Sequence, residues 1–226
     1  MFFPIGDDHI KGKYKPFVTY ILIAINCYVF WQQITLPEKE LNQLIYTYGA
    51  IPKFIMHGQR LFTLFTSLFL HGGWMHLIGN MMFLWIFGDN IEVTVGNVRF
   101  ALFYIIGGIF GAAVHSYLYA GSDVPCIGAS GAISAALGAY LILFPSSKIK
   151  ILFFIFVFRV SAFAFLGLWI VQQLLEGWAA IGPATGNTAG IGYWAHIGGF
   201  AYGFVFGLII LLSSRRKRTR SIDGYY

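Results

Sequence analysis

Six long apolar stretches run along the chain and are separated by shorter polar segments. A helix needs about 20 predominantly apolar residues to cross a hydrocarbon layer about 30 Å thick, and most of these stretches approach that length. The pattern therefore predicts an all-α fold, a polytopic membrane protein with six transmembrane helices. We place the spans at residues 17–35, 75–88, 98–119, 129–144, 160–177 and 193–212.

The composition supports a membrane protein. Hydrophobic residues make up 58% of the 226 residues, charged residues only 11%, and the mean hydropathy is +0.70. A soluble domain carries about 25% charged residues, which argues against a water-soluble globule. The net charge of +6 could indicate nucleic-acid binding, but five of the fifteen basic residues lie within 215–220, directly after the last apolar run. Such a cluster is typical of a cytosolic membrane anchor, so we predict the lipid bilayer as a partner and no nucleic acid.

The basic residues also predict the orientation of the chain. Cytoplasmic loops are enriched in Lys and Arg, and placing the N-terminus inside assigns eleven basic residues to cytoplasmic segments against three outside. The eleven are Lys11, Lys13, Lys15, Arg99, Lys148, Lys150, Arg215, Arg216, Lys217, Arg218 and Arg220, and the outer three are Lys39, Lys53 and Arg60. We therefore expect both termini in the cytoplasm.

The predicted organisation has three parts: a cytoplasmic N-terminal segment at 1–16, a six-span domain at 17–212 and a basic cytoplasmic tail at 213–226. The compact core suggests a bacterial plasma membrane. Within the domain, residues 36–74 are expected to form outer helices that lie in the membrane interface. Residues 149–175 are too long for a simple span, which suggests that their first half lies along the inner membrane surface.

Small residues predict which helices touch. The fourth span is rich in Gly and Ala, and Gly199, Gly203 and Gly207 recur every fourth residue in the sixth span. Glycine at this spacing leaves one helix face without side chains, so another backbone can approach closely. We expect the fourth and sixth spans to be in contact.

Polar groups inside the spans are the best functional clues, because they are costly in hydrocarbon. His71, His76 and Asn80 lie at the start of the second span, Ser130 at the start of the fourth, and His196 near the start of the sixth. All three starts face outward in the predicted topology. If the inner span ends lie at the cytoplasmic boundary, a helical rise of about 1.5 Å per residue places each group roughly 5 to 12 Å below the outer boundary, and the groups converge on one layer.

A hydroxyl and an imidazole at one depth supply a nucleophile and the base that activates it. Ser130 would begin a helix, where free amides and the helix dipole favour the negative charge of an oxyanion. His76 and Asn80 are four residues apart and so share a helix face, from which both could donate hydrogen bonds to the same oxyanion.

These residues carry a resemblance to the rhomboid family of intramembrane serine proteases. The matching segments are 71–80 (HGGWMHLIGN), 128–131 (GASG) and 195–199 (AHIGG), and the resemblance extends from about residue 60 to about residue 207. It is specific because three motifs fall on the correct spans in the correct order.

The resemblance implies a Ser-His dyad without an aspartate. Ser130 would attack a peptide bond in or near a transmembrane segment of a membrane-protein substrate, and His196 would accept its proton, with no metal or cofactor. His76, Asn80 and the Ser130 amide would form the oxyanion hole. The outer segment and the fifth span with its following loop, 177–193, would control lateral access of the substrate helix.

One position departs from the family pattern. An aromatic residue usually follows the serine by four positions and packs on the catalytic imidazole, but here that position is Ser134. We therefore expect His196 to be packed less firmly. The tryptophans near span ends are interpreted as interfacial anchors, and these are Trp74, Trp85, Trp169 and Trp194.

Four other interpretations fit the sequence less well. His71, His76 and His196 could be zinc ligands, although no His-Glu-x-x-His motif occurs. Asp89 faintly resembles an intramembrane aspartyl protease residue, but no second aspartate lies within a span. A catalytically silent relative that binds transmembrane helices is disfavoured by the intact Ser130 and His196. A transporter is disfavoured by the lack of repeat symmetry and of paired charges. The sequence names no substrate and no oligomeric state.

Overall fold

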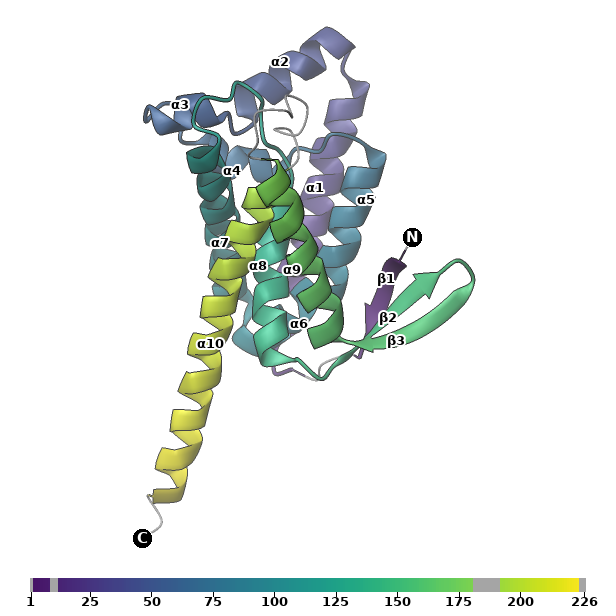
Figure 1. The fold of residues 1–226 in the computed structure, drawn as a ribbon, viewed down its shortest axis with the longest axis vertical. Helices are drawn as coiled ribbons and strands as arrows, with labels where there is room; N and C mark the ends of the chain where they lie inside the picture. The colour runs from purple at the N-terminus through teal and green to yellow at the C-terminus, as the bar shows by residue number, and fades with distance from the viewer. Residues whose placement is uncertain (1, 9–11, 181–191, 224–226) are drawn as a thin grey trace.

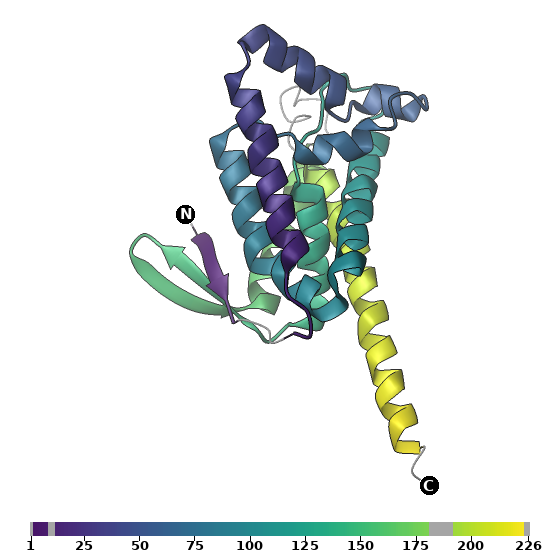
Figure 2. The same cartoon turned by 180° about the vertical axis from the view of Figure 1, so that it is seen from behind.

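The computed structural model describes residues 2–8, 12–180 and 192–223, with the side chains described from residue 3 to residue 214. This part of the chain forms a helical bundle with a small sheet at its side (Figures 1 and 2). In chain order its elements are β1 (Phe2–Asp7), α1 (Phe17–Thr35), α2 (Glu38–Tyr48), α3 (Pro52–Met56), α4 (Thr63–Thr66), η1 (Ser67–Phe69), α5 (Trp74–Phe83), η2 (Leu84–Gly88), α6 (Asp89–Val95), α7 (Asn97–Leu118), α8 (Ser130–Leu143), β2 (Lys148–Phe153), β3 (Phe156–Ser161), α9 (Ala162–Ala179) and α10 (Tyr193–Asp223).

Within the described residues, four helices are long and apolar enough to cross a membrane, by length and composition: α1, α7, α9 and the part of α10 at Tyr193–Ser214. The apolar helix α8 is shorter, with 14 residues. The protein is thus an integral, multi-pass membrane protein, as predicted. The helices α1, α7, α8 and α9 begin and end within two residues of four of the predicted spans.

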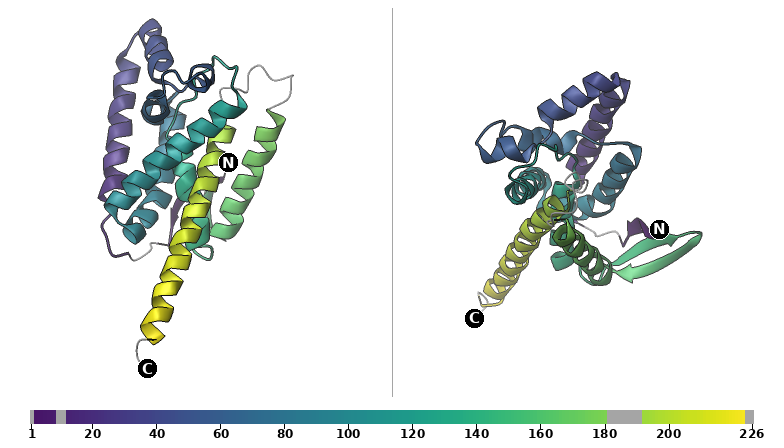
Figure 3. Two further views of the ribbon diagram at one scale, coloured as in Figure 1. Left: turned by 90° about the vertical axis from the view of Figure 1, so that its left-hand side faces the viewer. Right: turned by 45° about the horizontal axis from the view of Figure 1, so that its top comes forward.

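Two predicted span ends differ from the helix ends. The second span was expected to end at residue 88, but α5 continues through the π-helical turn η2 into α6, which buries Ile91 and Val95 in the core and ends before Gly96. The sixth was expected to end at residue 212, yet α10 continues to Asp223 and extends beyond the bundle (Figure 3). Its last residues are mostly Arg, Lys and Ser, which contain no helix breaker.

The all-α prediction is wrong for one region. Strands β1, β2 and β3 form an antiparallel sheet in the order β1-β2-β3. The alternation of Lys148 and Lys150 with the buried Ile149 and Ile151 has the period of a strand, not of a helix. The surface segment expected at the start of 149–175 is therefore a β-hairpin that leads into α9, and the predicted N-terminal segment contributes its third strand.

Helices α8 and α10 are in direct backbone contact, which confirms the predicted contact of the fourth and sixth spans. A Cβ atom added at Gly199 would overlap the carbonyl of Gly131, and one at Gly203 would overlap the carbonyl of Ala135. A Cβ at Gly138 on α8 would likewise overlap the carbonyl of Phe200 on α10. This close approach brings the first turns of the two helices together.

The segment from α2 to η1 lies across one end of the bundle, and the tail of α10 extends from the other end (Figures 1 and 2). The guanidinium of Arg60 links α2 to α3, because it lies 5.2 Å from the ring centre of Tyr46 and 4.4 Å from that of Phe54. Cys126, just ahead of α8, forms a backbone bridge with Ala50 at the same end. The placement of this segment in the membrane interface stays a prediction.

Glu92 on α6 holds the start of α1, at the end of the bundle from which the tail of α10 extends. Its fully buried carboxylate accepts hydrogen bonds from the backbone amides of Val18 and Thr19, both at 2.7 Å, and from the Asn97 side chain at 2.6 Å. The first amides of a helix have no partner within it, and their positive field favours an anion.

We expect Glu92→Gln to lower the stability of the folded protein by about 1–3 kcal/mol, because an amide NH₂ would face donors that have lost their acceptor. Thermal unfolding in detergent measures this loss. Glu38→Gln is the matched control, since Glu38 is exposed in the first turn of α2. Equal melting temperatures for the two variants would contradict the role of Glu92.

Candidate active site

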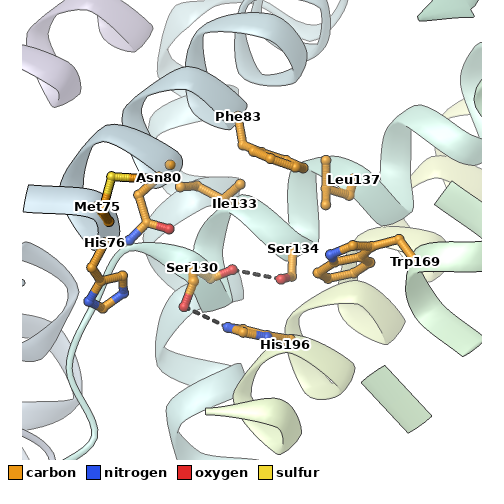
Figure 4. A pocket seen from close by; sticks show the side chains of 11 residues that line it. Met75, His76, Asn80, Phe83, Ser130, Ile133, Ser134, Leu137, Trp169 and His196 are labelled. Atoms are coloured by element: carbon orange, nitrogen blue, oxygen red, sulfur yellow. Dashed lines mark hydrogen bonds between the residues drawn. The ribbon is translucent and has the colours of Figure 1, made fainter. Parts of the chain in front are cut away.

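Ser130 and His196 meet where α8 and α10 begin. Ser130 is the first residue of α8 and His196 lies in the first turn of α10. The Ser130 Oγ atom is 2.8 Å from the His196 Nε2 atom, a hydrogen-bond distance (Figure 4). The glycine contacts between the two helices allow this approach over 66 residues of sequence. The sequence therefore predicted correctly that these two residues come together.

Gly128 brings α5 against the start of α8. Its φ of +124° lies in a region that L side chains rarely adopt, so the turn ahead of Ser130 favours glycine. A Cβ at this position would lie only 2.7 Å from His76 Nε2 and 3.6 Å from Asn80 Nδ2. Both side chains thus point toward the backbone beside Ser130, as Figure 4 shows.

The two side chains on α5 have donors available at this position. The Asn80 Nδ2 atom is buried and has no hydrogen-bond partner among the described residues. The Gly72 amide donates to His76 Nδ1 at 3.2 Å. In a neutral imidazole this leaves the proton on Nε2, so Nε2 can donate toward Gly128. A buried donor without a partner is unfavourable unless another group accepts its hydrogen bond.

The imidazole of His196 is held from α9, which the sequence did not predict. Its Nδ1 atom is 2.6 Å from the Oε1 atom of Gln173, and its ring centre is 6.0 Å from that of Trp169. Trp169 therefore lies in the site, and its interpretation as an interfacial anchor is wrong. Ser134 instead donates to the Ser130 carbonyl at 2.6 Å.

A signal for these residues was present in the sequence. Gln173 is a polar residue in an apolar span, which is the criterion that selected the other site residues. Trp169 lies four positions earlier and therefore on the same helix face. We expected His196 to be loosely packed because the aromatic position on α8 is taken by Ser134. The aromatic ring beside His196 is instead that of Trp169 on α9.

A cavity of about 240 Å³ opens beside the dyad, between α5, α8, α9 and α10. Most of its wall is apolar. Its lining residues are Met75, His76, Gly79, Asn80, Phe83, Ser130, Ile133, Ser134, Leu137, Trp169 and His196. Phe83 on α5 stacks on Phe165 on α9 with ring centres 6.5 Å apart, which connects the two helices beside the cavity.

The described histidines are spread over several elements. Within the described parts of the chain, no three His, Cys, Asp or Glu side chains are grouped to hold a metal ion. His71 is buried, and its ring centre lies 5.1 Å from that of His76. The Gln33 side chain donates a hydrogen bond to the His71 carbonyl and accepts one from the His71 amide. His115 on α7 packs on Tyr119, the residue that follows this helix. Most of the loop at 177–193 lies outside the described residues.

Known proteins are similar to this chain over most of its length. A family model described as the rhomboid domain matches residues 58–213. RHOMBOID-like protein 4 from Arabidopsis thaliana is 34% identical over 164 residues, which cover 73% of this chain and 38% of that protein. Rhomboid protein 1, mitochondrial, from Saccharomyces cerevisiae is 29% identical over 213 residues, which cover 92% of this chain and 57% of that protein. Rhomboid protease GluP from Bacillus subtilis is 32% identical over 134 residues, which cover 59% of this chain and 26% of that protein.

The chain spans less than two thirds of the length of each of these relatives. They include a mitochondrial and a bacterial protein, so the expected bacterial plasma membrane stays a prediction. The family match covers Ser130, His196, His76 and Asn80, and one relative is named a protease. By the extent of the family match and by these relatives, this chain belongs to the rhomboid family.

Proposed function

We propose that this protein is an intramembrane serine protease that hydrolyses peptide bonds in or near transmembrane segments of other membrane proteins. One observation carries the proposal: the Ser130 Oγ atom lies 2.8 Å from His196 Nε2, at the start of α8. A nucleophile within hydrogen-bond distance of a base, with that base held by a third group, is the arrangement that nucleophilic catalysis requires.

The reaction follows from this geometry. His196 Nε2 removes the Ser130 proton as Oγ attacks the substrate carbonyl carbon, and the carbonyl oxygen becomes an oxyanion. The donors that face this position are the Ser130 amide, Asn80 Nδ2 and His76 Nε2, which stabilise the charge as it develops. His196 then gives its proton to the leaving amine, and water attacks the acyl-enzyme by the reverse proton path.

The arrangement in the bilayer is part of the proposal. We assign the six spans to α1, the continuous helix from α5 to α6, α7, α8, α9 and α10, with both termini in the cytoplasm. The 14 residues of α8 measure about 21 Å, less than the ~30 Å hydrocarbon layer. If α8 ends near the cytoplasmic boundary, Ser130 lies below the outer membrane surface, where water must be admitted for hydrolysis.

The cavity suggests how the substrate is bound. Phe83, Ile133 and Leu137 give it an apolar wall that suits side chains of a transmembrane segment. The cavity lies between α5 and α9, and the stacked Phe83 and Phe165 must separate if a substrate helix passes between these helices. This position supports lateral access from the bilayer.

The test uses the purified full chain in liposomes with a single-span model substrate and a fluorophosphonate probe. We expect cleavage and a covalent adduct on Ser130, located by mass spectrometry, and no effect of EDTA. A relative that only binds transmembrane helices would give neither turnover nor an adduct. EDTA-sensitive cleavage without the adduct would instead favour a zinc enzyme.

Asn80 is expected to stabilise the transition state without being essential. Asn80→Ala should lower kcat by about 10- to 1000-fold, because loss of one oxyanion-hole donor costs about 10²–10³ in a soluble protease and two other donors remain here. Steady-state kinetics with a substrate whose cleavage is rate-limiting measures this. A raised KM at constant kcat would mean that Asn80 binds the substrate only.

A further inference from the structure

Gln173 is the only described side chain that meets the far nitrogen of the candidate base. Its Oε1 atom lies 2.6 Å from His196 Nδ1, and its side chain is only 7% exposed. The opposite ring nitrogen, Nε2, faces Ser130 at 2.8 Å. We propose that Gln173 is a positioning residue that fixes the tautomer and orientation of His196. This inference rests on the proposed serine protease function.

The tautomer decides whether His196 can act as a base. A neutral imidazole carries one N–H, and Nε2 accepts the serine proton only when that N–H is on Nδ1. The amide oxygen of Gln173 accepts a hydrogen bond from Nδ1–H and so stabilises the active tautomer. With the amide turned over, its NH₂ would donate to Nδ1 and leave the proton on Nε2, facing Ser130.

An amide suits this place better than a carboxylate. An ionised side chain within the bilayer is costly, whereas a neutral amide orients the ring without adding a charge. The nearest acid on the same helix, Glu176, accepts a hydrogen bond from Gln172 at 2.9 Å. Gln173 therefore takes the orienting role that an aspartate has in a catalytic triad.

The same face of α9 packs along the start of α10. Trp169 lies against the His196 ring, and the Gly177 carbonyl accepts a hydrogen bond from the Trp194 indole at 3.0 Å. Trp169 also lines the cavity. One helix thus forms part of the substrate wall and sets the orientation of the base, so a substrate that displaces α9 would also disturb His196.

The test compares Gln173→Leu, Gln173→Glu and the exposed neighbour Gln172→Leu. We expect Gln173→Leu to lower kcat by about 10- to 100-fold with KM within about twofold, since base catalysis contributes about 10²–10⁴. Gln173→Glu keeps the acceptor and should recover most of the turnover. Gln172→Leu should match the wild type. In ¹⁵N NMR of histidine-labelled protein, His196 should show the Nδ1–H tautomer, and Gln173→Leu should lose it.

Two results would overturn the proposal: wild-type kcat in Gln173→Leu, or an Nδ1–H tautomer of His196 that is unchanged in Gln173→Leu. The second would mean that the Gln173 oxygen does not select the tautomer. Failure of the proposed function looks different, because the wild type itself would then neither cleave the substrate nor label on Ser130.

The β2–β3 hairpin carries an exposed apolar tip. Phe154 is 78% exposed, Ile155 84% and Phe156 61%, and Val157 and Phe158 are also exposed. Successive strand residues point to opposite faces, so Phe156 and Phe158 lie on one face of β3 and Val157 on the other, and both faces are apolar and exposed near the tip. A water-exposed strand would carry polar residues on at least one face. The tip is therefore suited to an apolar environment.

The position of the hairpin indicates which environment this is. It projects sideways from the base of α9, a helix long and apolar enough to cross a membrane (Figures 1 and 2). Cationic residues lie toward the base of the hairpin, with Lys150 paired to Arg159 across the strands. Apolar residues beyond a row of cations are typical of segments that insert into an anionic membrane interface.

We infer that the hairpin tip, residues 154–158, inserts into the bilayer interface on the side of the protein opposite the dyad. Lys150 and Arg159 then face anionic headgroups. The backbone at the outer edge of β3 is unpaired within the sheet order, which limits the depth, because such groups are not tolerated in the hydrocarbon core. This anchor is additional to the six spans.

The test places a nitroxide at Ile155→Cys in a Cys27→Ser background, in liposomes that contain phosphatidylglycerol. Gly121→Cys, in the exposed loop after α7, is the control, and Phe154→Cys is a second tip site. We expect tip labels to be more accessible to O₂ than to an aqueous nickel chelate, and the control label the reverse. Tip labels as accessible to the chelate as the control, or equally immobilised in detergent and lipid, would overturn the inference.

Discussion

Ser130→Ala and His196→Ala are each expected to reduce cleavage of a single-span substrate to background while the protein stays folded. Removing the nucleophile or its base costs about 10⁶-fold in a soluble serine protease, and no other described hydroxyl lies at the His196 Nε2 atom. Rates of substrate cleavage in liposomes measure the loss, and thermal unfolding in detergent measures the stability of each variant.

Matched controls separate catalysis from structure. Ser116→Ala removes a buried hydroxyl on α7 that donates only to a backbone carbonyl, and His57→Ala removes an exposed imidazole. Both should retain turnover close to that of the wild type. If either Ser130→Ala or His196→Ala still turned over at a measurable fraction of the wild-type rate, the dyad would be wrong.

Gly128→Ala is expected to lower kcat by at least about 10²–10³-fold, the effect of losing an oxyanion-hole donor. The added Cβ would lie 2.7 Å from His76 Nε2 and so displace the His76 ring from the start of α8. The His76 donor would then move away from the oxyanion position. The rate of Ser130 labelling by the fluorophosphonate should fall with kcat, since the probe forms an oxyanion in the same place.

Backbone strain alone would not have this effect, and Gly58→Ala tests it. Gly58 also has a positive φ, of 71°, but a Cβ there meets nothing within 4 Å. Its replacement should cost some stability and leave turnover unchanged. Equal losses of activity in the two variants would show that strain, not displacement of the His76 ring, explains the Gly128 result.

The helices and the motif residues could be predicted from the sequence. In hydrocarbon, every backbone polar group must be bonded within the chain, so an apolar run of about 20 residues has the helix as its main solution. Ser130 and His196 were identifiable because polar groups in such runs are few and costly. The glycine spacing in 199–207 similarly predicted the contact between α8 and α10, which the backbone overlap at Gly199 confirms.

The sequence failed where a residue's role depends on a distant partner. Glu92 holds the start of a helix 73 residues earlier, and Gln173 meets an imidazole 23 residues later. Neither pairing has a local periodicity, because the bonded atoms meet only after the helices pack. The sheet was missed for the same reason: β1 pairs with a strand more than 140 residues away.

The sequence by itself thus determined where most of the helices lie and which polar residues gather in the candidate site, because both depend on local composition and on the cost of polar groups in hydrocarbon. Only the tertiary structure decided how His196 is held. Trp169 and Gln173 reach it from α9, while Ser134 on α8 turns to the Ser130 carbonyl. The physical reason is that side-chain orientation is set by helix packing, which brings together residues that are far apart in the chain.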